Sequence, residues 1–491
     1  MKQIFYFLSL PLLISTLHAQ KQPDYRWLMG FRTDSTEQGF YNISLRFETD
    51  SVYVDSVNLN MNFESTVASA TDSTGKLLFY TNGCEIRGTN GSLLPNGNGI
   101  NPGTLHDWVC EKGYTLPKGA MALPYPGHPS QWILLHTSGR YDSFRKVVYE
   151  NLNYTLIDMS LNGGLGAVLS KNNVLFSGET EPFSVVRHGN GRDWWVVVPV
   201  YGSNQYRLWL LSPTGFSAST AQNIGAVADC RKIGSTVFSA KGDKFARSSN
   251  CVTTVLDFDR CAGIFSNPID FNAGKFVFGG GGVAFTKDSR WLYTTGQQTL
   301  YGADLTLASP TLDTAYAWVV SLGVSLGQLQ NDWTSDKIYV GFMHRERFLS
   351  VIGKPLPNGG IDFRNEKLKL PVPTVRSIPN FPNFRLFDVS GSPCDTLGIN
   401  TAIAEVAQPK GLRVYPNPAS DELTIELPPN LQRSKLTLRL HNQLGQTVHS
   451  QAWREDSPTQ TISVASLPSG FYVVSVTNGA ETWYQKVIIQ R

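Results

Sequence analysis

A strand–turn–strand unit that recurs at a spacing of 47 residues is the feature that most constrains how this chain folds. Residues 237–245 (VFSAKGDKF) are matched 47 positions later by residues 284–292 (AFTKDSRWL). In each unit an apolar strand leads through a short polar turn into a second apolar strand. Further units of this kind occupy residues 72–80, 131–135, 191–198 and 334–340. A period in the forties predicts the four-stranded blades of a β-propeller.

The length of this region favours seven blades. Residues 24–391 would supply about 53 residues to each of seven blades. We expect the seventh blade to join the two ends, with residues 27–31 pairing with residues 384–387, because a closed ring leaves no sheet edge exposed. A six-bladed ring is the alternative. A β-helix fits less well, because its repeats are much shorter than 47 residues.

Residues 1–19 predict a removable export signal. Lys2 supplies the positive start, residues 4–14 are mostly apolar, and the small Ala19 marks the cleavage point. The apolar stretch is shorter than the roughly 20 residues that span a bilayer. No cysteine follows Ala19 directly, so a lipoprotein anchor is not expected, and no other segment predicts a membrane span. The propeller passenger is therefore expected to comprise residues 20–391.

Export makes the six cysteines candidates for disulfide bonds. No C-x-x-C pair occurs, which excludes a zinc ribbon by spacing. Six cysteines allow 15 pairings, and the sequence does not choose among them. Cys84 with Cys110 is the preferred pair, because both lie in one Gly- and Asn-rich stretch with no other cysteine near.

From about residue 412 the chain changes to compact alternation. Leu423, Ile425 and Leu427 alternate with polar residues, and similar runs follow up to Ile489. Period-two alternation places one face of each strand on a core and the other in water. Five to seven short strands in eighty residues predict a small Ig-like β-sandwich over residues 412–491. Residues 392–411 are small and polar, and they predict a linker.

Four segments of this C-terminal region occur in a specific order. They are residues 414–421 (VYPNPASD), 442–446 (NQLGQ), 467–472 (LPSGFY) and 486–489 (KVII). This series resembles the type A sorting domain of the type IX secretion system of Bacteroidota. The landmark residues of the resemblance are Tyr415, Pro416, Asn417, Pro418, Gly445, Leu467, Gly470, Tyr472 and Lys486. The alternative is that residues 412–491 form an ordinary Ig-like adhesion module.

The resemblance implies that this domain acts in secretion. It would be recognised by the outer-membrane translocon after passage through the periplasm, and then usually removed. The passenger would be released into the medium or attached to surface lipopolysaccharide. Residues 77–84, 256–261 and 393–398 also resemble exported propeller-like proteins of the same phylum, a family without a settled activity. That second resemblance supports the architecture alone.

The charge pattern argues against nucleic acid as a partner. The chain has 42 basic and 39 acidic side chains, a net charge of +3, and no run of like charges. A nucleic-acid-binding protein would show a basic stripe.

No catalytic, metal or cofactor site is predicted. The chain lacks H-E-x-x-H and an EF-hand loop. The run at residues 279–282 (GGGG) precedes a strand and not a helix, so it does not predict a phosphate cradle. Histidines at 106, 136, 188 and 344 are scattered without metal spacing. Glycoside hydrolysis needs two nearby carboxylates; Asp257, Asp259 and Asp304 qualify by type, but nothing predicts that they converge.

Two repeated residue types leave a choice open. Aspartates recur before the second strand of successive units, where they serve as turn residues or, less favourably, as a ring of carboxylates; they are Asp72, Asp193, Asp243, Asp288 and Asp336. Tryptophans are abundant, and an exposed ring suits stacking on sugars although most must be core; they include Trp108, Trp132, Trp194, Trp195, Trp209 and Trp291.

The sequence thus predicts an exported all-β protein whose propeller acts as a non-catalytic recognition module, with carbohydrate as a candidate ligand. The alternative is a polysaccharide-active enzyme, a glycoside hydrolase or lyase. Two or more carboxylates in one pocket would favour the enzyme.

Overall fold

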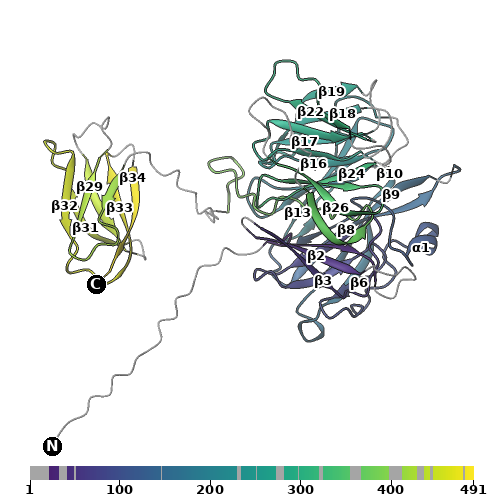
Figure 1. Ribbon diagram of the computed structural model, residues 1–491, viewed down its shortest axis with the longest axis horizontal. Helices are drawn as coiled ribbons and strands as arrows, with labels where there is room; N and C mark the ends of the chain where they lie inside the picture. The colour runs from purple at the N-terminus through teal and green to yellow at the C-terminus, as the bar shows by residue number, and fades with distance from the viewer. Residues whose placement is uncertain are drawn as a thin grey trace, which may run out of the picture. The chain divides into compact units, whose positions relative to one another are not determined.

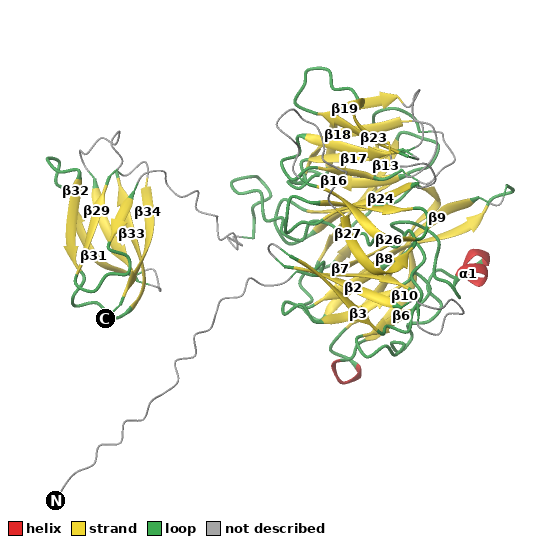
Figure 2. Cartoon of the chain, viewed as in Figure 1, coloured by secondary structure: helices red, strands yellow, loops and turns green. Residues whose placement is uncertain are grey.

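The computed structural model consists of two compact units, residues 1–399 and 400–491, and almost all of its regular structure is β-strand (Figures 1 and 2). The structure describes residues 22–490 except 33–40, 49–50, 145, 229–233, 250–251, 273–280, 297, 320–324, 354–366, 398–411, 428–435, 443–445 and 479–481. The export signal predicted at residues 1–19 and most of the predicted linker therefore lie outside the described residues.

The described residues of the first unit form seven antiparallel sheets, which we call blades 1 to 7 in chain order. Blade 1 consists of β1 (Arg26–Gly30), β2 (Asn42–Phe47) and β3 (Val52–Val57), and blade 2 of β4 (Ala68–Thr71), β5 (Leu77–Thr81) and β6 (Ile86–Gly88). Blade 3 consists of β7 (Ala120–Pro124), β8 (Gln131–Tyr141), β9 (Val147–Asp158) and β10 (Ala167–Thr180). Blade 4 consists of β11 (Ser184–Arg187), β12 (Trp194–Pro199), β13 (Gln205–Ser212), β14 (Gly215–Phe216) and β15 (Thr220–Asn223).

The last three blades each have four strands in simple sequential order. Blade 5 consists of β16 (Ser235–Phe238), β17 (Lys244–Ser248), β18 (Val252–Asp259) and β19 (Ile264–Asn272). Blade 6 consists of β20 (Val283–Phe285), β21 (Trp291–Thr295), β22 (Thr299–Asp304) and β23 (Asp313–Val319). Blade 7 consists of β24 (Leu326–Asn331), β25 (Ile338–Phe342), β26 (Glu346–Ile352) and β27 (Lys367–Thr374). The helix α1 (Thr104–Val109) and a 3₁₀ turn (Asn162–Gly164) interrupt the strands.

Successive blades pack face to face and the ring closes. The first strands β1 and β4 contact each other, as do β4 and β7, β11 and β16, β16 and β20, and β20 and β24. Blades 3 and 4 meet through Tyr154 and Phe216, whose ring centroids are 4.9 Å apart. Blade 7 meets blade 1 through β27 and β1 and through Tyr339, whose ring lies 5.4 Å from that of Trp27. The all-β, seven-bladed propeller is thus confirmed, and the six-bladed alternative is wrong.

The repeated unit in the sequence is the first hairpin of a blade. Residues 237–245 contain the end of β16, its turn and the start of β17, and residues 284–292 do the same for β20 and β21. The four looser units fall on the corresponding hairpins of blades 2, 3, 4 and 7. The six predicted recurrences therefore mark six different blades, and blade 1 is the one that the repeat did not reveal.

The predicted closure by strand pairing is wrong. Among the described strands, β1 pairs with β2 and with no other, and residues 384–387 form no strand. The two ends meet instead through side chains, because Arg385 Nη1 donates to Asp24 Oδ2 at 2.7 Å and the rings of Trp27 and Phe381 stack with centroids 6.4 Å apart.

The described residues of the second unit form a β-sandwich of seven strands. One sheet holds β28 (Arg413–Tyr415), β29 (Glu422–Glu426) and β32 (Thr459–Ser463), and the other holds β30 (Thr437–His441), β31 (Thr447–Ala452), β33 (Gly470–Thr477) and β34 (Thr482–Ile489). The alternating residues Leu423 and Ile425 are buried between the sheets, as the period-two pattern predicts. Among the described residues, no helix has the length and apolarity needed to cross a membrane.

Candidate functional site

A pocket of about 350 Å³ lies where blade 3 meets blade 4. One wall is the long β8–β9 hairpin, another is the passage from β10 into β11, and Gly234 lies beside it just before β16. The lining residues are Arg140, Asp142, Ser143, Lys146, Val147, Val148, Tyr149, Glu179, Thr180, Glu181, Pro182, Tyr201 and Gly234. The size fits a small polar ligand such as one or two sugar rings.

Glu181, which lines the pocket, forms a buried ion pair with Arg247. Arg247 Nε and Nη2 donate to the two carboxylate oxygens of Glu181, each at 2.7 Å. The side chains are only 6% and 1% exposed. Burial acts to lower the pKa of Arg247, but the adjacent Glu181 carboxylate outweighs it and raises the pKa above its ordinary value. Arg247 Nη1 also donates to the carbonyl of Ser203. The ion pair therefore links β17 to the β10–β11 connection and to the β12–β13 loop.

The other two carboxylates of the pocket are also bonded. Glu179 accepts a hydrogen bond from Arg140, whose Nε lies 3.6 Å from Glu150. Asp142 accepts the backbone N–H groups of Phe144 and Lys146 at 2.9 and 2.8 Å, which shapes the β8–β9 turn. A carboxylate that is held by a guanidinium or by backbone donors is stabilised as an anion. The wall is therefore built to accept and donate hydrogen bonds at fixed positions.

One polar atom in the pocket is left without a partner. Thr180 Oγ1 is buried and makes no hydrogen bond within the part of the chain that the structure describes. This oxygen has almost no exposed surface, so a ligand in the pocket does not reach it in this structure.

An exposed tryptophan and a partly exposed tyrosine lie together where α1 meets the β8–β9 hairpin. Trp108 on α1 is 69% exposed, and its ring centroid lies 5.5 Å from that of Tyr141 at the end of β8. We call these two residues the aromatic platform. The expectation that most tryptophans are core is confirmed, because the other five are buried: Trp132, Trp194, Trp195, Trp209 and Trp291. Trp108 is therefore the ring of that group that can meet a ligand.

Cys84 and Cys110 form a disulfide that fixes α1 beside the platform. Cys110 is the residue that ends α1, and Cys84 is buried with Leu105 and Tyr149 in one apolar cluster. Among the described residues, these two cysteines and His106 make the one group with the geometry to hold a metal ion. Sulfurs that are bonded to each other are not thiolates, so this group does not fit a metal.

The structure does not bring the three candidate acids together. Asp257 pairs with Lys244 at 2.6 Å, and Asp259 accepts the N–H groups of Cys261 and Ala262 in the turn after β18. Asp304 lies in blade 6, where the hydrogen bond from Arg290 lowers its pKa to about 2. Each carboxylate has its own local partner, and none of the three lines the pocket.

The other predicted turn residues are engaged locally too. Asp72 Oδ1 accepts the N–H groups of Thr74 and Lys76, and Asp288 Oδ1 accepts that of Arg290, as hairpin aspartates do. Asp243 accepts from Ser239, Asp193 accepts from Asn190 and Arg192, and Asp336 lies 3.4 Å from Lys287 Nζ. The first two glycines of the run at 279–282 lie outside the described residues, and Gly282 leads into β20.

The histidines occupy separate places. His136 is buried between Asn101 Oδ1 and Thr155 Oγ1, and burial lowers its pKa to about 3. His188 Nε2 contacts the carbonyl of Cys261, whereas His344 is exposed.

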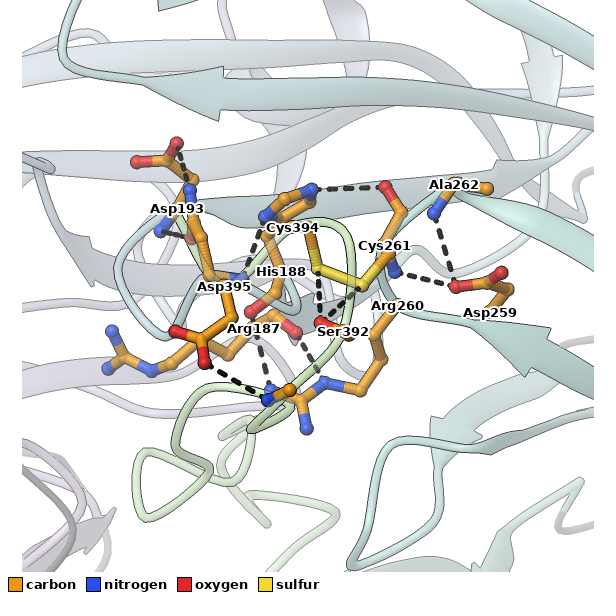
Figure 3. The surroundings of a disulfide bond; sticks show 12 residues. Arg187, His188, Asp193, Asp259, Arg260, Cys261, Ala262, Ser392, Cys394 and Asp395 are labelled. Atoms are coloured by element: carbon orange, nitrogen blue, oxygen red, sulfur yellow. Dashed lines mark hydrogen bonds between the residues drawn. A yellow bond between two sulfur atoms is a disulfide. The ribbon is translucent and has the colours of Figure 1, made fainter. Parts of the chain in front are cut away.

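A second disulfide, Cys261–Cys394, escaped the sequence analysis (Figure 3). Cys261 ends the segment 256–261 and Cys394 lies in the segment 393–398, so both of these motif segments carry a cysteine that could have suggested the pair. The first described residues of the predicted linker are therefore bonded to blade 5. Cys230 and Cys251 lie outside the described residues.

The landmark residues of the C-terminal unit hold its strands together. Asn417 Oδ1 accepts the N–H of Ile488, and Tyr472 Oη donates to the carbonyl of Pro468 at 2.9 Å. The peptide bonds before Pro416 and Pro418 are cis. Gly470 begins β33, Leu467 packs on the core, and Lys486 lies on β34. Gly445 lies outside the described residues.

Comparison with known families decides what this unit is. Residues 413–490 match the model of the secretion system C-terminal sorting domain. The C-terminal unit is a secretion sorting domain. It directs the chain through the type IX secretion system to the cell surface or the medium and engages the translocon of that system. The predicted localisation is thereby confirmed.

About seven tenths of the chain is similar to solved structures, at low identity. A candidate 6-phosphogluconolactonase from Bacteroides fragilis has 11% identity and a TM-score of 0.44, with 73% of this chain and 98% of that chain covered. A second, from Bacteroides uniformis, has 11% identity and a TM-score of 0.42, with 71% and 97% covered. The periplasmic gluconolactonase of Pseudomonas aeruginosa has 13% identity and a TM-score of 0.40, with 71% and 97% covered. No curated protein matches the sequence. No activity follows from likenesses this distant.

Proposed function

We propose that the propeller is a non-catalytic recognition module that binds carbohydrate at the β8–β9 hairpin. The observation that carries the proposal is the pocket beside this hairpin, whose three carboxylates are all held in place by hydrogen bonds. Fixed donors and acceptors suit sugar hydroxyls, which present both functions. The sorting domain brings this module to the cell exterior, where polysaccharides are accessible.

The aromatic platform adds a flat apolar surface to the same hairpin. Trp108 and Tyr141 expose ring area beside the polar side chains of His106 and Asp107, which lie 3.3 Å apart. A sugar ring has an apolar face of C–H groups and a polar rim, so it can stack on an indole while its hydroxyls meet polar neighbours. A longer glycan could therefore use both the platform and the pocket.

Glycan binding by the purified passenger tests the proposal, with purified polysaccharides of known composition as probes. Lys146→Ala in the pocket and Trp108→Ala on the platform should each weaken binding about tenfold, which equals about 1.4 kcal/mol. Lys76→Ala and Tyr53→Ala are matched controls, because both residues are exposed on other blades. Equal affinities of all four variants and the wild type would reject a site at this hairpin.

The second candidate function is cleavage of a polysaccharide. It is favoured by one observation, namely that Asp142, Glu179 and Glu181 line the same pocket. Against it, Glu181 has both oxygens bound to Arg247 and so has no free oxygen to protonate a leaving group. Product release that is abolished by Glu179→Gln at unchanged melting temperature would establish the enzyme and overturn the binder.

We further propose that the mature passenger is attached to surface lipopolysaccharide or released, as the sorting-domain resemblance implies. Fractionation into outer membrane and medium, followed by detection of lipopolysaccharide on the passenger, distinguishes the two fates.

A further inference from the structure

After the last strand of blade 7, the chain enters a segment that belongs to no sheet. We call residues 376–389 the strap. It begins on blade 7, where Arg376 donates its N–H to the carbonyl of Phe342, and the Ile378 side chain packs on Gly341. Arg376 itself has a positive φ of 49°, which turns the chain away from β27.

The first half of the strap joins blades on different sides of the ring. Asn380 donates to the carbonyl of Lys118, just before β7 of blade 3. Phe381 accepts a hydrogen bond from Gln330 of blade 7 through its carbonyl, and its ring stacks on Trp27 of blade 1. All five of these side chains are buried.

The second half reaches blades 4 and 5 and returns to blade 1. Asn383 donates to the carbonyl of Ala240 at 2.8 Å in the first hairpin of blade 5. The ring of Phe384 meets Trp194 of blade 4 edge to face, with centroids 5.7 Å apart. Arg385 is paired with Asp24, which precedes β1. Burial raises the pKa of Asp24, although Arg385 acts to lower it.

These contacts place the strap at the axis of the ring. Blades 7 and 1 are neighbours, and blades 3, 4 and 5 form a separate group of neighbours on the ring. A short segment can touch both groups only where the innermost strands of all blades face one another. In agreement, residues 380–383 and Leu386 line one narrow cavity together with residues of β11, β16 and β24. The strap therefore fills the centre of the propeller.

The end of the strap is fastened to the opposite side of the ring from where it started. Val389 donates its N–H to the carbonyl of Gly189 at 2.7 Å, and the carbonyl of Phe387 accepts from Arg260 Nη2 at 2.5 Å. Cys394 is then bonded to Cys261, in the turn between β18 and β19 of blade 5 (Figure 3). Figure 3 also shows Ser392 beside the two sulfurs.

We propose that the strap closes this propeller in place of a shared strand, and that the Cys261–Cys394 disulfide protects it from tension on the sorting domain. The residues that follow Cys394 lead to the sorting domain, which the translocon engages. A tensile force applied to that domain is transmitted along the chain to Cys394 first. The disulfide transmits the force from Cys394 to Cys261 in blade 5, so that no force acts on the hydrogen bonds and ring contacts of residues 376–389.

Single-molecule pulling tests the protective role, with the chain from residue 20 to residue 491, which keeps the sorting domain, held by its two ends. In the oxidised wild type, the first event should be the unfolding of the sorting domain or of a whole blade. In the Cys261→Ala/Cys394→Ala variant, a short early event should release residues 376–393, which adds about 65 Å of chain. Cys84→Ala/Cys110→Ala is the matched control and should lack the early event, because that disulfide does not touch the strap.

Hydrogen exchange tests the closing role. Phe381→Ala/Phe384→Ala should raise exchange by at least tenfold in β1 and β27, at the seam between blades 1 and 7, before other strands respond. Phe285→Ala removes a ring that is equally buried in blade 6 and should raise exchange in blade 6 first. If the Cys261/Cys394 variant shows no early event, the protective role is wrong. If the seam responds no sooner than blade 6 in the strap variant, the closing role is wrong.

Discussion

Removal of one partner of the buried Glu181–Arg247 ion pair should lower the free energy of unfolding of the propeller by an amount that can be calculated. Arg247 is buried on all sides and binds both carboxylate oxygens of Glu181 and the carbonyl of Ser203. Arg247→Met therefore leaves a carboxylate with 6% exposure and no cation. Removal of one partner of a buried pair costs about 3–5 kcal/mol. For a passenger of this length, a loss of 4 kcal/mol lowers the melting temperature by about 5 °C.

The assay is thermal unfolding of the full chain, followed by near-ultraviolet circular dichroism, because the buried tryptophans report on the propeller. Glu181→Leu should cost a similar amount, since it leaves the guanidinium unpaired. The double variant Glu181→Leu/Arg247→Met should lose much less than the sum of the two, because an apolar pair of similar volume is often as stable as the ion pair. Two single losses below about 1 kcal/mol, or strictly additive losses, would refute the interpretation of Glu181 and Arg247 as an energetically coupled buried ion pair.

Three further predictions address other parts of the chain. Non-reducing peptide mapping should find Cys84 linked to Cys110, and the Cys84→Ala/Cys110→Ala variant should lose about 3–4 kcal/mol of unfolding free energy by the chain-entropy estimate for its loop of 26 residues; two free thiols in the secreted form would contradict it. Deletion of residues 412–491 should leave the passenger folded but retained in the periplasm, as fractionation would reveal, and normal amounts in the medium would disprove the sorting role. Burial lowers the pKa of Lys118 to about 7, so the unfolded chain binds the Lys118 proton more tightly than the folded chain does. The free energy of unfolding should therefore fall as the pH decreases from about 10.5 to 7. Lys118→Met should flatten this pH dependence in urea unfolding, and identical pH profiles of variant and wild type would argue against a buried lysine.

Local pattern was enough to predict the two architectures. Residues 237–245 and 284–292 resemble each other because each must form an apolar hairpin that packs on its neighbours, and that requirement is written into adjacent residues. Leu423 and Ile425 alternate with polar residues for a similar reason, since one side of β29 faces the sandwich core. The sorting motif could be recognised because its residues occur as short contiguous segments.

The candidate site required the tertiary structure. Glu181 and Arg247 are 66 positions apart and meet only because blades 4 and 5 are neighbours. The expected acids Asp257 and Asp304 were judged by residue type, and their local partners could not be seen in a linear pattern. Trp108 looked like the other tryptophans, but its exposure depends on a short helix that is held by a disulfide.

The closure of the ring separates what the sequence decides from what the tertiary structure decides. The sequence by itself determined that the passenger consists of repeated hairpins and that its two ends must meet, because apolar hairpins have to be buried and open sheet edges are avoided. It could not decide how the ends meet, because the strap has no period: its residues contact five different blades through single side chains and carbonyl groups. Cys261 and Cys394, 133 positions apart, become partners only when the strap crosses the axis. Contacts between distant residues depend on the whole fold, and only the tertiary structure decides them.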